Sequence, residues 1–133
     1  MPHGLLLFAH GARDPAWARP FEEVRDRLAA EHGPGTPVVL AFLEFMHPTL
    51  PQAGGQLASQ GCERVTVVPL FLGAGGHVRK DLPRLMDQIR RQHPAIDWRL
   101  APAAGETDIV VRALADAAWH LSQASQPAEG HGA

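Results

Sequence analysis

The sequence is poor in cysteine, in net charge and in long apolar runs. Cys62 is the single cysteine in 133 residues, so no internal disulfide can form, and neither Gly61 nor Glu63 beside it would activate its thiol. Twelve basic against fourteen acidic residues leave a formal charge of -2, without the basic excess of a nucleic-acid binder. No apolar run approaches the ~20 residues that span a bilayer, and no basic leader precedes the first apolar run. We expect a cytoplasmic protein that binds neither nucleic acid nor membrane.

Common catalytic and phosphate-binding motifs are also missing. The sequence contains no HExxH, the signature of many zinc hydrolases. The glycines Gly73, Gly75 and Gly76 match neither GxxxxGK[ST] nor GxGxxG, and Lys80 is wrongly spaced for the first motif. These absences disfavour nucleotide binding and weaken the case for a hydrolase.

What the chain does contain is an alternation of two hydrophobic periods. Continuous apolar runs at 5–9, 38–43 and 65–72, with a weaker one at 98–101, are typical of strands covered on both faces. Between and after them, apolar residues recur at helical spacing. The pattern predicts βαβαβαβα, which makes a four-stranded parallel sheet between two layers of helices. The length fits one domain, 1–122, followed by a polar tail at 123–133 that we expect to be disordered.

A few residues that commonly start or end helices and strands predict the element boundaries. Asp14 and Asp81 each stand just before a predicted helix, where an aspartate can cap, and Gly33 and Gly61 fit helix ends. Pro69 lies inside the third apolar run, and proline cannot donate to a sheet ladder. We therefore expect the regular strand to end near residue 68.

Three of the apolar runs lead into a side chain that can bind a divalent metal. His10 follows the first run, Glu44 the second and His77 the third. The carboxyl ends of parallel strands share one edge, where open α/β sheets bind ligands. Each histidine alone is more often structural, but two imidazoles and a carboxylate at equivalent positions favour a metal site for cobalt, nickel, iron or zinc. His47 is a secondary candidate.

Residues around the predicted site suit a large anionic ligand. Gly75 and Gly76 would let the backbone approach such a ligand closely. Arg13 follows His10, and Arg79 and Lys80 follow His77, so positive charge gathers at the same edge. Each charge taken singly is more often a solvated surface group.

Three motifs in this order resemble the class II chelatases, the sirohydrochlorin cobaltochelatases and their nickel- and iron-inserting relatives. They are HGARDP at 10–15, AFLE at 41–44 with PTL at 48–50, and VPLFL at 68–72 with GH at 76–77 and DLP at 81–83. The resemblance spans roughly 5–121. One departure is Ala12, where the family commonly has serine, so this chain has no hydroxyl there.

The resemblance implies a flavodoxin-like chelatase lobe that inserts a divalent metal, most readily Co²⁺, into sirohydrochlorin or a related anionic tetrapyrrole. His10, His77 and Glu44 would then bind the metal and assist deprotonation. Substrate carboxylates would be contacted by Arg13, Arg79 and Lys80, and the backbone at Gly75 and Gly76 would approach the ligand closely. The metal would be a substrate, and no cofactor would be permanently bound. The resemblance to the short members of the family also implies a homodimer.

Three alternatives remain open from the sequence. The chain could insert iron or nickel as a ferrochelatase or nickelochelatase. It could be a non-catalytic carrier of metal or tetrapyrrole that uses the same ligands. It could also be a zinc hydrolase with Glu44 as general base. Steady-state turnover with several metals separates these readings.

Overall fold

The computed structural model describes residues 2–73 and 75–124, and of His77 only the backbone. Four strands alternate with helices along the chain, as the periodicity predicts. The elements are β1 (His3–Ala9), the 3-10 turn η1 (Pro15–Ala18), α1 (Arg19–His32), β2 (Val38–Phe42), α2 (Leu50–Ser59), β3 (Arg64–Pro69), α3 (Gly76–Gln92), β4 (Asp97–Leu100), the 3-10 turn η2 (Ala104–Glu106) and α4 (Asp108–Ala124).

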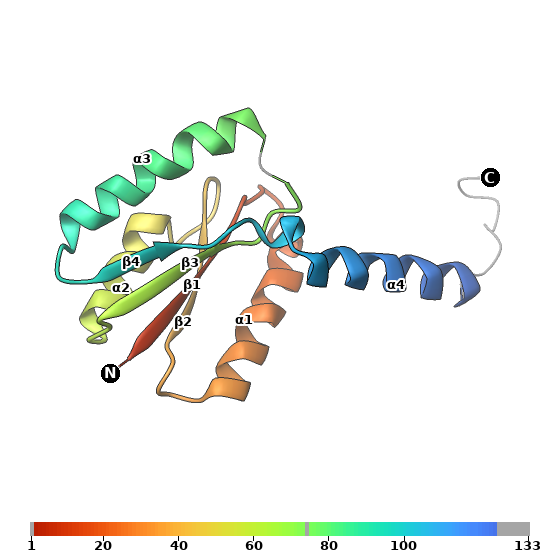
Figure 1. Ribbon diagram of the computed structural model, residues 1–133, viewed down its shortest axis with the longest axis horizontal. Coiled ribbons are helices and arrows are strands. Elements are labelled where there is room, and N and C mark those ends of the chain that lie inside the picture. Colours follow the sequence, from red (N-terminus) through yellow and green to blue (C-terminus); the bar gives the residue numbers. More distant parts are fainter. Residues whose placement is uncertain (1, 74, 125–133) are drawn as a thin grey trace.

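The strands form one parallel sheet in the order β2-β1-β3-β4. In its register Phe8 of β1 pairs with Ala41 on one side and Pro69 on the other. The predicted α/β class and the four-stranded parallel sheet are therefore confirmed. All four strands run the same way, so their carboxyl ends meet at one edge of the sheet (Figure 1).

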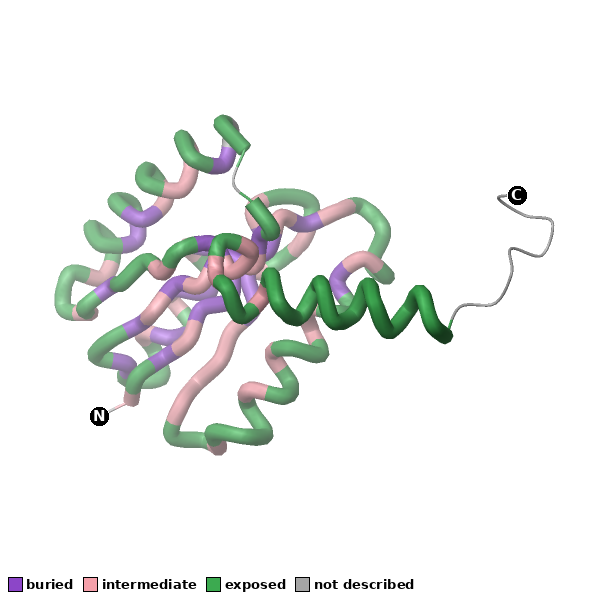
Figure 2. The backbone as a smooth tube through the Cα atoms, turned by 45° about the vertical axis from the view of Figure 1, so that its right-hand side comes forward, coloured by how far each residue is buried: buried purple, intermediate pink, exposed green. Residues whose placement is uncertain are grey.

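Helices cover both faces of the sheet, although unequally. Helices α2 and α3 pack on one face, and α1 packs on the other over β2 and β1 (Figure 1). Buried residues concentrate in the strands and on the inner sides of α2 and α3, whereas α1 has none (Figure 2). Gly54 of α2 lies against Ile89 of α3, where an added Cβ would overlap the isoleucine side chain, so these two helices are closely packed.

Strand β3 runs one residue further than expected, because Pro69 is its last residue. The Leu70 N–H donates to the Phe8 carbonyl at 2.7 Å, so the Pro69 nitrogen faces the β4 side. There the ladder has already ended, since the last β3–β4 pair is Val67 with Leu100. Proline therefore costs no sheet hydrogen bond at this position.

Three of the four predicted helix boundaries are confirmed, and one is wrong. The Asp14 side chain accepts from the Ala16 N–H and caps η1, directly before α1. Gly33 and Gly61 follow α1 and α2 with φ of 70° and 80°. Asp81 does not cap α3, which begins five residues earlier at Gly76. The prediction from Asp81 was wrong because the start of a helix also depends on where the preceding strand and loop end.

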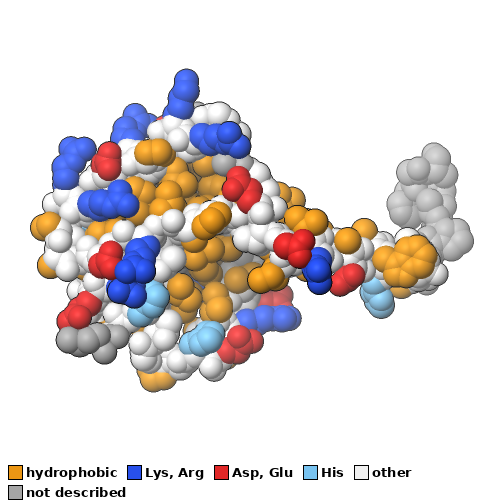
Figure 3. All heavy atoms as spheres, viewed as in Figure 1, with side chains coloured by type: hydrophobic (Ala, Val, Ile, Leu, Met, Phe, Trp, Pro, Cys, Tyr) orange, Lys and Arg blue, Asp and Glu red, His pale blue; other side chains and the backbone are white. Residues whose placement is uncertain are grey.

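Helix α4 departs most from the expected layers, because it projects away from the sheet (Figure 1). It has no buried residue, and its exposed large hydrophobic side chains are Ile109, Val111, Leu114, Trp119 and Leu121. Figure 3 shows hydrophobic side chains along α4 and on the body beside its first turn. Gln123 and Ala124 end this helix, while the rest of the predicted tail, 125–133, lies outside the described residues.

None of the helices within residues 2–73 and 75–124 is both long and apolar enough to cross a bilayer.

Candidate functional site

The carboxyl ends of β1 and β2 stay hydrogen-bonded beyond the regular strands. The Leu43 N–H donates to the Ala9 carbonyl at 2.9 Å, and the Glu44 N–H donates to the His10 carbonyl at 3.1 Å. Gly11, at φ 94°, lies so close to the Glu44 backbone that an added Cβ would overlap the Glu44 carbonyl oxygen. Glycine at this position therefore allows the two loops to meet.

This approach brings His10 and Glu44 together as the sequence predicts. His10 Nε2 lies 2.9 Å from Glu44 Oε1. Their side chains are 44% and 43% exposed, so the pair is open to a ligand from solvent. The His10 ring also meets the buried Phe71 ring edge-on, with centroids 6.4 Å apart. Since Phe71 follows β3, three strand ends contribute to the environment of His10.

An imidazole nitrogen and a carboxylate oxygen this close form half of a transition-metal site. Such ligands bind zinc-like ions at about 2.1 Å, which places two ligand atoms of a tetrahedral site about 3.4 Å apart. The present separation of 2.9 Å needs to widen by about half an ångström to admit an ion. Exposed side chains can make that adjustment.

His77 is the second residue of α3, and its side chain lies outside the described part of the structure. Its backbone position follows β3 at the carboxyl edge, as expected from the sequence. Within the described residues, no three His, Cys, Asp or Glu side chains gather closely enough to hold a metal. The role of His77 as third ligand stays a prediction.

The predicted substrate-binding residues occupy the same edge. Gly75 precedes α3 and Gly76 is its first residue, with open space around both α-carbons. Gly75 has φ -70°, so it does not use the left-handed freedom of glycine. Arg79 and Lys80 are exposed in the next turn of α3. Their contacts with a substrate remain predictions.

A pocket of about 360 Å³ is lined by residues that follow His10 and Glu44 in the chain, although neither member of the pair lines it. The Arg13 guanidinium stands over the Phe45 ring, 5.0 Å from its centroid, at this pocket. His47 also lines it, and its Nδ1 lies 3.1 Å from Gln52 Oε1, so its ring is tied to the start of α2. Sequence reasoning missed Phe45. The available signal was a large apolar side chain placed just after Glu44, where β2 has ended.

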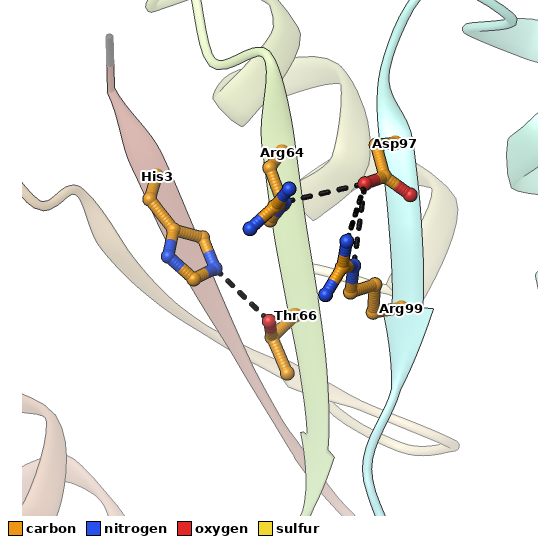
Figure 4. Close-up of polar contacts among 5 residues, drawn as sticks. All are labelled: His3, Arg64, Thr66, Asp97 and Arg99. Carbon is orange, nitrogen blue, oxygen red and sulfur yellow. Dashed lines mark hydrogen bonds and ion pairs between the residues drawn. The ribbon is translucent and has the colours of Figure 1, made fainter.

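A second polar cluster lies at the opposite, amino-terminal edge of the sheet (Figure 4). His3 Nε2 is 3.0 Å from Thr66 Oγ1, and Arg64 and Arg99 both donate to Asp97. The hydrogen bond from Arg99 holds the pKa of Asp97 below its ordinary value, with the charges of Arg99 and Arg64 adding to it. A pocket of about 380 Å³ is here. Because its arginines already share a carboxylate and open parallel sheets bind ligands at the other edge, we assign this cluster a structural role.

Cys62 does not contribute to either edge as a nucleophile. Its side chain is buried, and burial raises the pKa of the thiol above its ordinary value. A thiol held in its neutral form is a poor nucleophile and metal ligand.

Together, the fold and the edge define an open α/β protein that presents a mixed nitrogen and oxygen pair at the carboxyl ends of its parallel strands. The chain belongs to the CbiX family, whose profile matches residues 4–120. This agrees with the resemblance to class II chelatases read from the three motifs.

Curated relatives carry the name sirohydrochlorin cobaltochelatase. The one from Methanothermobacter thermautotrophicus is 34% identical over 85 residues, which are 62% of this chain and 57% of the relative. Another, from Methanocaldococcus jannaschii, is 35% identical over 89 residues, covering 67% of this chain and 62% of the relative. The matches thus span less than two-thirds of the length of these relatives.

Solved structures show the same fold. A protein from Marinobacter aquaeolei VT8, named for CbiX and cobalamin (vitamin B12) biosynthesis, superposes with a TM-score of 0.78 at 32% identity, covering 92% of this chain and 98% of that one. The sirohydrochlorin chelatase SirB from Bacillus subtilis subspecies spizizenii, solved with cobalt, gives 0.74 at 23% identity. It is matched over 91% of this chain but only 51% of its own, and at this identity the likeness concerns the fold alone.

Proposed function

We propose that this chain is a chelatase that inserts a divalent metal, most readily Co²⁺, into sirohydrochlorin or a related anionic tetrapyrrole. The observation that carries the proposal is the His10–Glu44 pair, 2.9 Å apart and half exposed at the carboxyl edge of a CbiX-family fold. The relatives named sirohydrochlorin cobaltochelatase support the choice of metal and ring. The metal is a substrate here, and the proposal needs no permanently bound cofactor.

The chemistry of insertion matches this pair. A free tetrapyrrole exchanges two pyrrole N–H protons for one divalent ion, so the site must present the ion and accept protons. A neutral imidazole and a carboxylate can do both. Few protein ligands and open coordination positions also let the ion leave for the ring nitrogens, whereas a closed four-ligand site would retain it. His77, as the third predicted ligand, would leave the site open in the same way.

The decisive experiment is steady-state metallation. Purified chain is mixed with sirohydrochlorin and an excess of Co²⁺, Ni²⁺ or Fe²⁺, and the visible absorption change is followed against a protein-free control. Product in large excess over protein supports a catalyst. Tight binding that stops at one equivalent per chain would make the protein a carrier instead. Equal rates with and without protein would contradict the proposal.

Which metal is inserted in the cell depends on the metal supply as much as on the protein ligands. Affinity of a nitrogen and oxygen site rises along the first-row series toward copper, so this site alone selects weakly between Co²⁺ and Ni²⁺. Iron insertion would make the chain a sirohydrochlorin ferrochelatase.

We also propose a cytoplasmic location, which is supported by a single cysteine with a buried thiol.

We further propose that the chain acts as a homodimer, with α4 in the interface. Val111, Leu114, Ala118 and Leu121 recur at spacings of three and four, so they share one face of α4. That face is exposed in the single chain. The direction of α4 is set by η2, because the Thr107 N–H and hydroxyl both donate to the Ala104 carbonyl immediately before the helix begins. A second copy can cover the apolar face without changing that turn.

Leu114→Asp is therefore expected to convert the dimer to a monomer. Leu114 is 49% exposed in the single chain, so a charge there leaves the fold intact but would be buried without a partner in the dimer. Light scattering at micromolar concentration measures the change, and Gln123→Asp, which adds the same charge on the polar face, is the matched control. A wild-type particle of 14.4 kDa under these conditions would refute the dimer.

A further inference from the structure

Two large hydrophobic side chains are exposed on either side of the strand that leads to His10. Phe45, which follows β2, is 57% exposed, and Leu72, which follows β3, is 68% exposed. Strands β2 and β3 are the two neighbours of β1 in the sheet. We propose that Phe45 and Leu72 are the apolar contacts that hold the flat ring of the tetrapyrrole across the carboxyl edge, one on each side of His10.

This inference rests on the proposed function and adds to it the residues that grip the ring. The predicted metal ligands and cations explain how the edge binds an ion and peripheral carboxylates. They do not explain how it binds the apolar body of a macrocycle. Ligand sites in proteins are lined mostly by apolar and aromatic side chains, with a few polar groups that orient the ligand. Phe45 and Leu72 supply that apolar part beside the His10–Glu44 pair.

Phe45 is held outward by the backbone rather than left there by chance. Its φ of 67° lies in the left-handed region, which a bulky side chain adopts only at a cost of about 1 to 3 kcal/mol. The preceding residue, Glu44, is fixed by its N–H bond to His10 and by its close approach to Gly11. Such strain persists where the surroundings impose it, and it is concentrated at ligand-binding sites.

Arg13 places a positive charge beside the Phe45 ring, where an anionic aromatic ligand would bind. Its guanidinium stands over the ring at 5.0 Å, an arrangement stabilised by the ring quadrupole. No carboxylate pairs with Arg13 within the described residues, so its donors are available to a ligand. The remaining surface of the Phe45 ring can then contact the macrocycle while Arg13 reaches a carboxylate at its rim.

Leu72 is held outward by its neighbours on both sides. Phe71 turns inward and packs edge-on against Phe8, with ring centroids 5.8 Å apart. The Phe71 carbonyl accepts a hydrogen bond of 2.8 Å from the Gly105 N–H. Gly105 lies directly against the Leu72 backbone, where an added Cβ would overlap it. With the backbone clamped against η2 and Phe71 buried, the Leu72 side chain stays in solvent.

The separation of the two loops suits a macrocycle rather than a small ring. Adjacent strands lie about 4.8 Å apart, so the ends of β2 and β3 stand about 10 Å apart with β1 between them. A ligand that touches both Phe45 and Leu72 must bridge that distance over His10. A tetrapyrrole does so, whereas a single five- or six-membered ring reaches only one of the two.

The inference is tested by binding of metal-free ring, with no insertion step. Sirohydrochlorin, and separately a carboxylated metal-free porphyrin, is titrated into the full chain and followed by absorption and by quenching of its emission. Phe45→Ala and Leu72→Ala are each expected to weaken binding about ten-fold, as loss of roughly 50 Å² of apolar contact implies. Phe45→Tyr keeps the ring and should bind as the wild type does. Val24→Ala, which trims an exposed apolar residue of α1, is the matched control.

Two further measurements separate ring contact from other roles. Co²⁺ affinity, measured by calorimetry without tetrapyrrole, should stay within about two-fold of wild type in every variant, because the His10–Glu44 pair is intact. Light scattering should show an unchanged oligomeric state. Unchanged ring binding in the double variant Phe45→Ala/Leu72→Ala would overturn the inference. It would also be overturned if the weaker ring binding came with a loss of Co²⁺ binding or of the dimer. If wild type binds the ring through these residues but never metallates it, the proposed function fails and this inference stands.

Discussion

His10→Ala is expected to lower the rate of sirohydrochlorin metallation by about 100-fold or more. The substitution removes both a predicted metal ligand and the proton acceptor that lies 2.9 Å from Glu44. Because the imidazole is 44% exposed and packs against Phe71 only at its edge, its removal should leave the fold unchanged. His77→Ala should give a loss of similar size if His77 is the third ligand. Steady-state absorption assays with Co²⁺ measure both effects.

The matched control for these variants is His32→Ala. His32 is the last residue of α1, is exposed and lies at the opposite end of that helix from the carboxyl edge. Its removal should leave turnover at the wild-type rate. Circular dichroism confirms that each variant folds, and calorimetry measures its affinity for Co²⁺. Wild-type turnover in both His10→Ala and His77→Ala would remove these histidines from the mechanism.

Gly11→Ala is expected to damage both the stability of the chain and the candidate site. At φ 94° any side chain is strained, and the new Cβ would overlap the Glu44 carbonyl oxygen. Backbone strain and overpacking together predict a loss of about 3 kcal/mol in the free energy of unfolding. For a chain of this size that corresponds to a fall of roughly 10 °C in Tm. Relief of the overlap would move the Glu44 loop away from His10, so metallation should also be lost.

Gly35→Ala is the control for this glycine substitution. No atom lies within 4 Å of the Cβ that it would add, and its backbone is not in the left-handed region. Its expected effect on Tm is therefore small, or slightly stabilising through the unfolded state. Thermal denaturation followed by circular dichroism gives both values. If Gly11→Ala melted and turned over as the wild type does, the proposed dependence of the site on this close approach would be wrong.

Local patterns were sufficient to predict the elements and the edge where the candidate site lies. Continuous apolar runs identified the four strands, because strands of a parallel sheet are covered on both faces. Helical spacing between the runs then implied parallel strands whose carboxyl ends coincide. That rule alone placed His10 and Glu44 at one edge, and the structure brings them into contact. Short-range periodicity and the handedness of connections depend little on distant packing, so they can be read from sequence.

Other features depended on contacts between residues far apart in the chain. Asp81 resembles a helix cap, yet α3 begins at Gly76, where the loop after β3 leads. The apolar face of α4 is visible in the sequence, but the direction of the helix is set by η2. Phe45 has a φ of 67° and directly follows Glu44, whose backbone lies against Gly11 of another loop. The sequence by itself thus determined the strands, the helices and their common edge, because these follow from local period and chain handedness. Only the tertiary structure decided which side chains the loops present there, because that depends on how separate loops pack together.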